Sequence, residues 1–139
     1  MFFEFTESTK NKALTFLRIA IGITFIFHGY PKMMGGMEMW TGLGGAMSSI
    51  GITFLPAFWG FMAAATEFFG GIFLILGIFY KPTTILLAFT MLVATAMHLS
   101  NGDPFSATSH PLKMIFVFIF MFFAGPGSAA IDNKFRKRR

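Results

Sequence analysis

Two ionisable side chains lie inside otherwise apolar runs of the sequence, and they are the first candidates for chemistry. Arg18 interrupts the apolar run that begins at Ala13, and Glu67 stands alone within ATEFFGGIFLILGIF, residues 65–79. A charged side chain in a lipid-embedded helix costs about 3 kcal/mol on insertion scales, so such groups usually face the protein interior and find a partner. We therefore expect Arg18 and Glu67 to form a buried charged pair.

The neighbours of this expected pair favour an interior position, because small residues let helices approach closely in lipid. At helical spacing, Glu67 shares a face with Ala63, Gly70, Gly71, Leu74 and Gly77, and Arg18 shares a face with Gly22, Phe25 and Gly29. The pair has three interpretations. It is an internal staple without chemistry, a proton-accepting or ligand-orienting pair, or an Arg18 beside a Glu67 that is simply protonated.

All three histidines fall at the opposite end of the expected helices, where lysines join them. The candidate ligand or quinone pocket consists of His28, Lys32, His98, His110 and Lys113. His28 or His98 can donate a hydrogen bond to an oxygen of a quinone or another small molecule. Bis-histidine ligation of haem or a metal ion is a second interpretation, and ordinary interfacial placement of polar residues is a third. No residue is assigned as catalytic or as a metal ligand.

The amino-acid composition indicates whether these ionisable side chains lie in a water-soluble protein or in a membrane protein. The chain has 139 residues, of which 55% are hydrophobic and only 12% are charged, whereas a soluble domain usually carries about 25% charged residues. We therefore expect a single-domain integral membrane protein. The chain has no cysteine, which excludes disulfides, cysteine-ligated iron–sulfur clusters and thiol redox chemistry. A redox role then requires a bound cofactor, a bound quinone or a partner protein.

Four apolar runs have about the length that a membrane-spanning helix needs, and each is apolar on all sides. The sequence therefore predicts an all-α, four-helix membrane bundle with helices at about 13–30, 54–79, 83–99 and 111–127.

The expected helix ends rest on proline and turn signals. Tyr30-Pro31 should end the first helix, Tyr80-Lys81-Pro82 should turn between the second and third, and Pro111 should open the fourth. Residues 101–104, Asn-Gly-Asp-Pro, are a further turn signal. The segment 31–53 is interrupted by glycines, and we expect it to lie at the membrane interface or over the helix ends.

Lysine and arginine residues predict the orientation. With four spans, both termini lie on the same side, and that side collects eight of the eleven basic residues: Lys10, Lys12, Lys81, Lys134, Arg136, Lys137, Arg138 and Arg139. The positive-inside rule then places both termini in the cytoplasm. We expect the basic tail 133–139 to contact anionic lipid headgroups and not nucleic acid.

Four stretches of the sequence resemble the DoxX family of small bacterial and archaeal membrane proteins. They are LRIAIGITFIFHGYPKM, EFFGGIFLILGIFYKPT, MLVATAMHLSNG and FFAGPGSAAID. The matching positions are Arg18, His28, Gly29, Lys32, Glu67, Gly70, Gly71, Gly77, His98, Gly125, Gly127 and Asp132. The resemblance extends from Ala13 to about Asp132 and implies a four-helix membrane bundle.

The resemblance also implies a class of function. The family takes its name from small subunits associated with quinone-linked oxidation, including thiosulfate:quinone oxidoreductase, so we expect a small membrane subunit or partner of a quinone-linked oxidoreductase. The chain shows no self-contained catalytic motif. The alternatives are a structural or assembly membrane protein without bound ligand, and a carrier of a small molecule or proton through the Arg18–Glu67 region. Expected partners are membrane lipid and oxidoreductase proteins. The sequence leaves open whether the chain forms a homo-oligomer. The expected location is the bacterial or archaeal inner membrane.

Overall fold

The computed structural model describes residues 6–136, which form helices and no strand. The elements are α1 (Glu7–Met34), α2 (Gly36–Gly44), the 3-10 helix η1 (Gly45–Ile50), α3 (Pro56–Leu76), α4 (Tyr80–Ser100), α5 (Phe105–Ala124) and α6 (Ile131–Arg136). Within this part of the chain, α1, α3, α4 and α5 are long and apolar enough to cross a membrane. The protein is therefore an all-α integral membrane protein, as the composition predicts.

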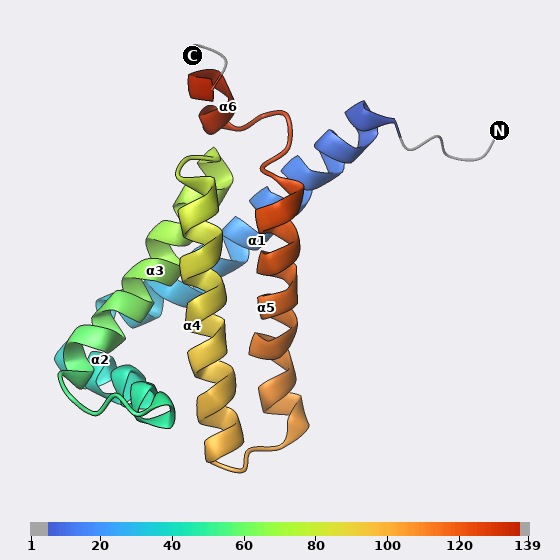
Figure 1. The fold of residues 1–139 in the computed structure, drawn as a ribbon. Helices are drawn as coiled ribbons and strands as arrows, with labels where there is room; N and C mark the ends of the chain where they lie inside the picture. Colours follow the sequence, from blue (N-terminus) through green and yellow to red (C-terminus); the bar gives the residue numbers. More distant parts are fainter. Residues whose placement is uncertain (1–5, 137–139) are drawn as a thin grey trace.

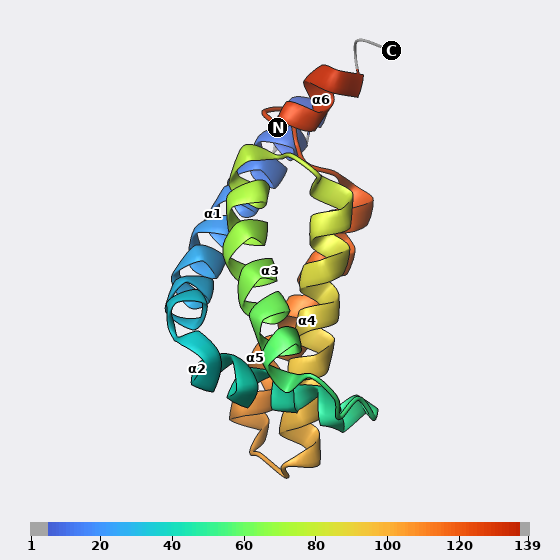
Figure 2. The same ribbon diagram turned by 90° about the vertical axis from the view of Figure 1, so that its left-hand side faces the viewer.

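Helices α1 and α3 form one closely packed antiparallel pair (Figures 1 and 2). Glycines permit this approach. A Cβ on Gly22 would lie 2.7 Å from the carbonyl oxygen of Gly71, and a Cβ on Gly29 would overlap the backbone of Phe68. In lipid, where burial of apolar surface gives no net gain, close backbone contact of this kind is a main source of helix association.

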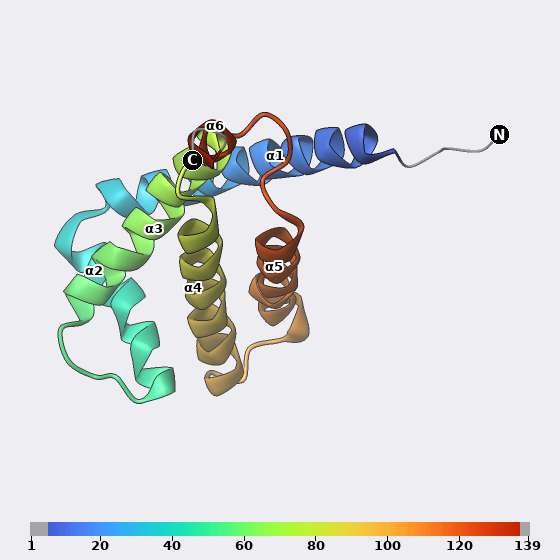
Figure 3. The same ribbon diagram turned by 45° about the horizontal axis from the view of Figure 1, so that its top comes forward.

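Helices α4 and α5 form the second pair and run side by side, while α1 is strongly inclined to both (Figure 3). The core between the two pairs is apolar and contains Phe25, Leu74, Tyr80, Leu87, Met91, Phe118 and Met121. Because the pairs are not parallel, α3 and α4 separate as they leave the turn that joins them (Figure 1).

The α3–α4 turn is held by a residue far away in the sequence. Gly77 ends α3 in the left-handed conformation, with φ of 67°, and Asp132 then caps α4 by accepting hydrogen bonds from the amides of Phe79, at 3.1 Å, and Tyr80, at 2.9 Å. The Tyr80 hydroxyl donates to the carbonyl of Met121 at 2.9 Å. The C-terminal segment thereby joins the ends of α3, α4 and α5.

The first helix begins at Glu7 and not at residue 13, and the second ends at Leu76 and not at residue 79. Three further predicted boundaries are wrong because of expectations about prolines. Helix α1 continues through Pro31 to Met34, α4 begins at Tyr80 with Pro82 in its first turn, and α5 begins at Phe105 with Pro111 inside it. Proline lacks the amide hydrogen that a helix interior needs, but a first turn does not use it. Inside membrane helices, neighbouring groups satisfy the freed carbonyls. The predicted turn at residues 101–104 is confirmed.

The interrupted segment after α1 does not span but folds back against the bundle. Helix α2 packs against α3, and η1 packs against α4. The indole Nε1 of Trp40 donates to the carbonyl of Lys32 at 2.9 Å and so fixes α2 against the end of α1. This confirms the expectation that the segment covers helix ends. The segment also closes the wedge between α3 and α4.

The two described ends of the chain lie at the same end of the molecule (Figure 1). The predicted tail 133–139 overlaps α6, and its residues 137–139 lie outside the described part of the chain. The predicted end of the fourth helix at residue 127 lies beyond its observed end at Ala124.

Candidate functional site

The buried carboxylate of Glu67 pairs with Lys32 and not with Arg18. Lys32 Nζ lies 2.6 Å from Glu67 Oε2, and the two side chains are 31% and 5% exposed. The predicted Arg18–Glu67 pair is therefore wrong, although both residues are buried as expected.

The register of α1 against α3 explains this choice of partner. The contact between Gly22 and Gly71 brings these two residues together in an antiparallel pair. Arg18 lies four residues from this contact in one direction and Glu67 lies four residues from it in the other, which separates them by roughly 12 Å along the helices at 1.5 Å per residue. Lys32, in contrast, follows Gly29 by one turn, and Gly29 contacts the backbone at Glu67. Because α1 passes through Pro31, Lys32 stays on a helix and faces α3.

Arg18 is bound by backbone carbonyls at the opposite end of the bundle. Its Nη1 donates to the carbonyls of Leu74 at 2.6 Å and Ile75 at 3.0 Å, and its Nη2 donates to that of Ala129 at 3.1 Å. Carbonyls in the last turn of a helix carry the negative end of its dipole, so they attract a cation. Arg18 thus links the end of α3 to the C-terminal segment, which is a structural role.

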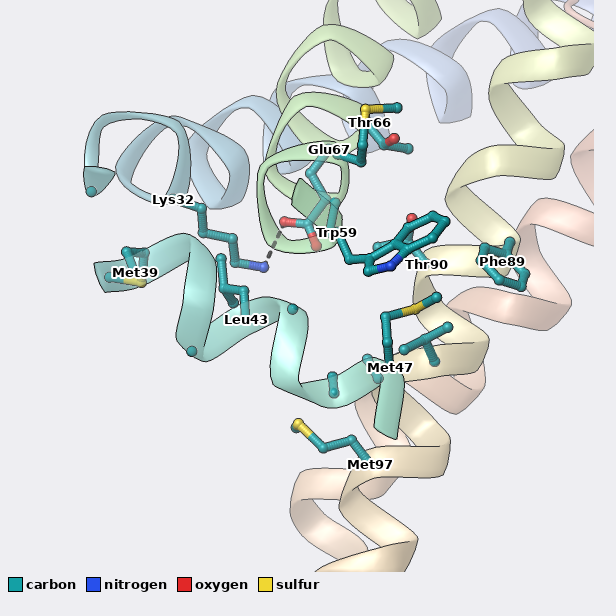
Figure 4. Close-up of a pocket in the computed structure, with 18 of the residues that line it drawn as sticks. Lys32, Met39, Leu43, Met47, Trp59, Thr66, Glu67, Phe89, Thr90 and Met97 are labelled. Carbon is teal, nitrogen blue, oxygen red and sulfur yellow. Dashed lines mark hydrogen bonds and ion pairs between the residues drawn. The ribbon is translucent and has the colours of Figure 1, made fainter. Parts of the chain in front are cut away.

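A cavity of about 750 Å³ lies beside the Lys32–Glu67 pair, in the wedge between α3 and α4 (Figure 4). Helices α2 and η1 form its third wall through Met39, Leu43 and Met47. Its volume falls within the range of roughly 300–1,000 Å³ that is typical of small-molecule sites, which are mostly apolar with a few placed polar groups.

Residues with polar groups that line the cavity besides the ion pair include Glu38, Trp59, Thr66, Thr90 and His98. Trp59, Thr66 and Thr90 line it together with Lys32 and Glu67 (Figure 4). The indole Nε1 of Trp59 is buried and has no hydrogen-bond partner among residues 6–136. A buried donor without a partner costs about 1–3 kcal/mol, so a ligand that accepts this hydrogen bond would gain from it.

The structure separates the residues of the candidate ligand or quinone pocket. Lys32 and His98 line the cavity, whereas His28, His110 and Lys113 do not. His98 Nδ1 lies 2.7 Å from Asp103 Oδ2.

His28 is exposed on α1, and its ring lies 5.9 Å, between centroids, from the exposed ring of His110 on α5. Lys113 is also exposed on α5. The grouping of His28 and His98 in one ligand pocket is therefore wrong, because His28 lies against His110 of α5 and outside the cavity that His98 lines. Residues 6–136 contain no group of three or more His, Cys, Asp and Glu that could hold a metal ion.

Sequence reasoning missed the aromatic and sulfur-containing walls of the cavity. A signal for Trp59 was present, because positions 59, 63 and 67 lie on one face of α3 at helical spacing, and all three line the cavity. The contribution of Met47 carried no such signal, because it depends on how the segment after α1 folds back.

Comparison with known proteins identifies relatives of this chain. It is 33% identical over 138 residues to an uncharacterized protein of Haemophilus influenzae, with 95% of this chain and 97% of that protein covered. It is 26% identical over 141 residues to the inner membrane protein YphA of Escherichia coli, with 96% of each chain covered. No solved structure matches. The sequence profile of the DoxX family matches residues 13–99, which include Arg18, Lys32, Glu67 and His98. The chain therefore belongs to the DoxX family.

Proposed function

We propose that the cavity binds a neutral ligand of quinone type, and that the protein serves a membrane redox system as its ligand-binding subunit. The observation that carries this proposal is the buried Lys32–Glu67 pair at the wall of an apolar cavity of about 750 Å³. The resemblance to small subunits of quinone-linked oxidation supports the redox assignment.

The charge of the pair selects the ligand. Lys32 and Glu67 compensate each other and Glu38 adds a negative charge at the cavity wall, so an anionic ligand would be desolvated in a site of net negative charge, which is unfavourable. A neutral head group avoids this cost. The Lys32 ammonium has three donors, of which one is used by Glu67, so a quinone carbonyl can accept from another and from Trp59 Nε1. A quinol hydroxyl can instead donate to the Glu67 carboxylate.

Binding of a short-chain benzoquinone to the purified protein tests this function. We expect quinone to copurify from native membranes and to be found by lipid extraction. We expect Lys32→Met to weaken binding by about tenfold or more, the loss of one hydrogen bond to a charged donor. Lys113→Met should leave binding unchanged, because Lys113 is exposed and lies outside the cavity.

A second variant separates binding from folding. Ala94→Phe narrows the cavity from its α4 wall, whereas the two residues of the ion pair belong to α1 and α3. It should abolish binding while the protein stays folded, and Leu92→Phe, at a lipid-facing position that is 50% exposed, should not. If the wild type binds no quinone and cavity variants change only stability, a structural or assembly role without bound ligand replaces this proposal.

We further propose that the protein lies in the inner membrane with both termini in the cytoplasm. The name of the Escherichia coli relative and the excess of basic residues at the terminal side support this. The chain has no cysteine, so single cysteines report accessibility cleanly. In intact spheroplasts, a membrane-impermeant maleimide should label Asn101→Cys at once and Ser8→Cys only after lysis. The reverse pattern would invert the orientation.

A further inference from the structure

A second hollow adjoins the cavity on the lipid-facing side of α3 and α4. This hollow, here called the α3–α4 groove, has a volume of about 410 Å³ and shares Thr66 and Leu86 with the cavity. Its other walls are apolar and include Phe69, Phe73 and Phe79. From Thr66 to Phe73 the groove follows α3 for seven residues, roughly 10 Å. The groove therefore extends from the wall that it shares with the cavity at Thr66, next to Glu67, toward the α3–α4 turn.

The groove is open to the bilayer along its rims. Phe69, Phe79 and Leu86 are 45%, 65% and 54% exposed. Its floor is closed, because Gly70 packs against the buried side chain of Leu87, which a Cβ on Gly70 would approach to 3.3 Å. An occupant of the groove thus contacts protein below and lipid above, which suits a hydrocarbon chain.

The opposite end of the cavity has a different character. A neighbouring hollow of about 420 Å³ shares Gly42, Ala46 and Met97 with the cavity and is lined by polar residues of η1 and the end of α4: Ser48, Ser49, Ser100 and Asn101. The cavity and the two hollows beside it are therefore polar at one end, charged near the middle through Lys32, Glu38 and Glu67, and apolar toward the α3–α4 turn. This is the polarity sequence of an amphiphile with a compact head and one long chain.

We propose that the ligand carries a long hydrocarbon chain, which leaves the cavity between Thr66 and Leu86 and lies in the α3–α4 groove. This inference rests on the proposed function and assigns the chain of that same ligand. A phospholipid fits less well, because its anionic phosphate would enter a cavity lined by the carboxylates of Glu38 and Glu67 as well as by Lys32. The groove then has two roles: it adds affinity for long-chain ligands, and it is the lateral entrance from the bilayer.

The test compares a benzoquinone without a side chain and the same head group with a ten-carbon chain. Long-chain quinones partition into detergent even without protein. The ratio of the long-chain affinity to the head-group affinity is therefore measured for each variant and compared with the same ratio for the wild type. Ala65→Phe obstructs the groove but lies outside the cavity wall. It should weaken binding of the long-chain quinone by about tenfold or more and leave that of the head group within about twofold. Ala13→Phe, at an exposed position of α1 away from the groove, should change neither affinity.

Cross-linking locates the chain independently of any variant. A quinone with a photoreactive group at the end of its chain should label the peptide that contains Phe73 and Phe79, and excess unlabelled long-chain quinone should suppress this labelling. If Ala65→Phe weakens both probes equally or neither, the chain does not occupy the groove. If added phospholipid alone suppresses the labelling, the groove is a general site for lipid chains and not the chain site of this ligand. In both cases the proposed function stands. If the wild type binds neither probe, both proposals fail together.

Discussion

Lys32→Met is expected to lower the free energy of unfolding by about 3–5 kcal/mol, the usual cost of removing one partner of a buried ion pair. The Glu67 side chain is only 5% exposed, so its carboxylate would lose its partner without gaining water. Glu67→Met should cost less, because the Lys32 side chain is already 31% exposed and its flexible stem can carry the ammonium to the surface. The free energy is measured by unfolding in mixed micelles.

A double-mutant cycle identifies the partner. Lys32→Met combined with Glu67→Met should recover most of the lost stability, since an apolar pair of similar volume often replaces a buried ion pair without loss. The coupling free energy should be about 2–3 kcal/mol. The control cycle, Arg18→Met with Glu67→Met, should be additive within about 0.5 kcal/mol, as expected for residues without shared contacts. Strong coupling in the control cycle and none between Lys32 and Glu67 would contradict the pairing described here.

Arg18→Met is expected to cost about 3 kcal/mol or more. The guanidinium donates to three backbone carbonyls, and hydrogen bonds from a charged donor contribute about 1.5–3 kcal/mol each without adding fully. Arg18→Lys should recover part of the loss, because an ammonium keeps the charge but cannot reach α3 and Ala129 with the planar fork of arginine. Lys12→Met, an exposed cation on the same helix, should stay within about 0.5 kcal/mol of wild type.

The destabilisation caused by Arg18→Met should begin in one part of the structure. Because Arg18 holds Ala129, its replacement should release the C-terminal segment, including the Asp132 cap on α4. Hydrogen exchange should therefore accelerate first at the amides of Phe79, Tyr80 and Asp132, and later in the middle of α3. Uniform acceleration along all helices, or an effect no larger than that of Lys12→Met, would show that Arg18 does not join these segments.

The sequence by itself determined the class of the protein and the inward faces of α1 and α3. Composition decides which solvent a chain can fold in, so 55% hydrophobic residues with 12% charged indicated membrane helices without further information. The interior faces followed from helical spacing alone: Arg18, Gly22, Phe25 and Gly29 are the buried residues of α1. The burial of Glu67 followed for the same reason, because a carboxylate cannot face lipid cheaply.

The helix ends were less accessible to sequence reasoning. A proline signal is local, but its effect depends on whether neighbouring groups can satisfy the freed carbonyl. The wrong prediction that the first helix ends at Pro31 also led to the wrong partner for Glu67. If the helix ended there, Lys32 would not lie on the helix that faces α3, and Arg18 would be the nearest candidate partner.

Only the tertiary structure decided which groups meet. The close contact of Gly22 with Gly71 sets the register of α1 on α3, and this register sends Arg18 to the carbonyl end of α3 and Lys32 to Glu67. The cavity exists because α3 and α4 diverge and the segment after α1 closes the wedge between them. Local sequence patterns predict which side chains must face away from lipid, because the free-energy cost of exposing a charged side chain to lipid depends on that residue alone. The choice of partner is a property of two helices in contact, and it depends on a register that neither helix carries by itself.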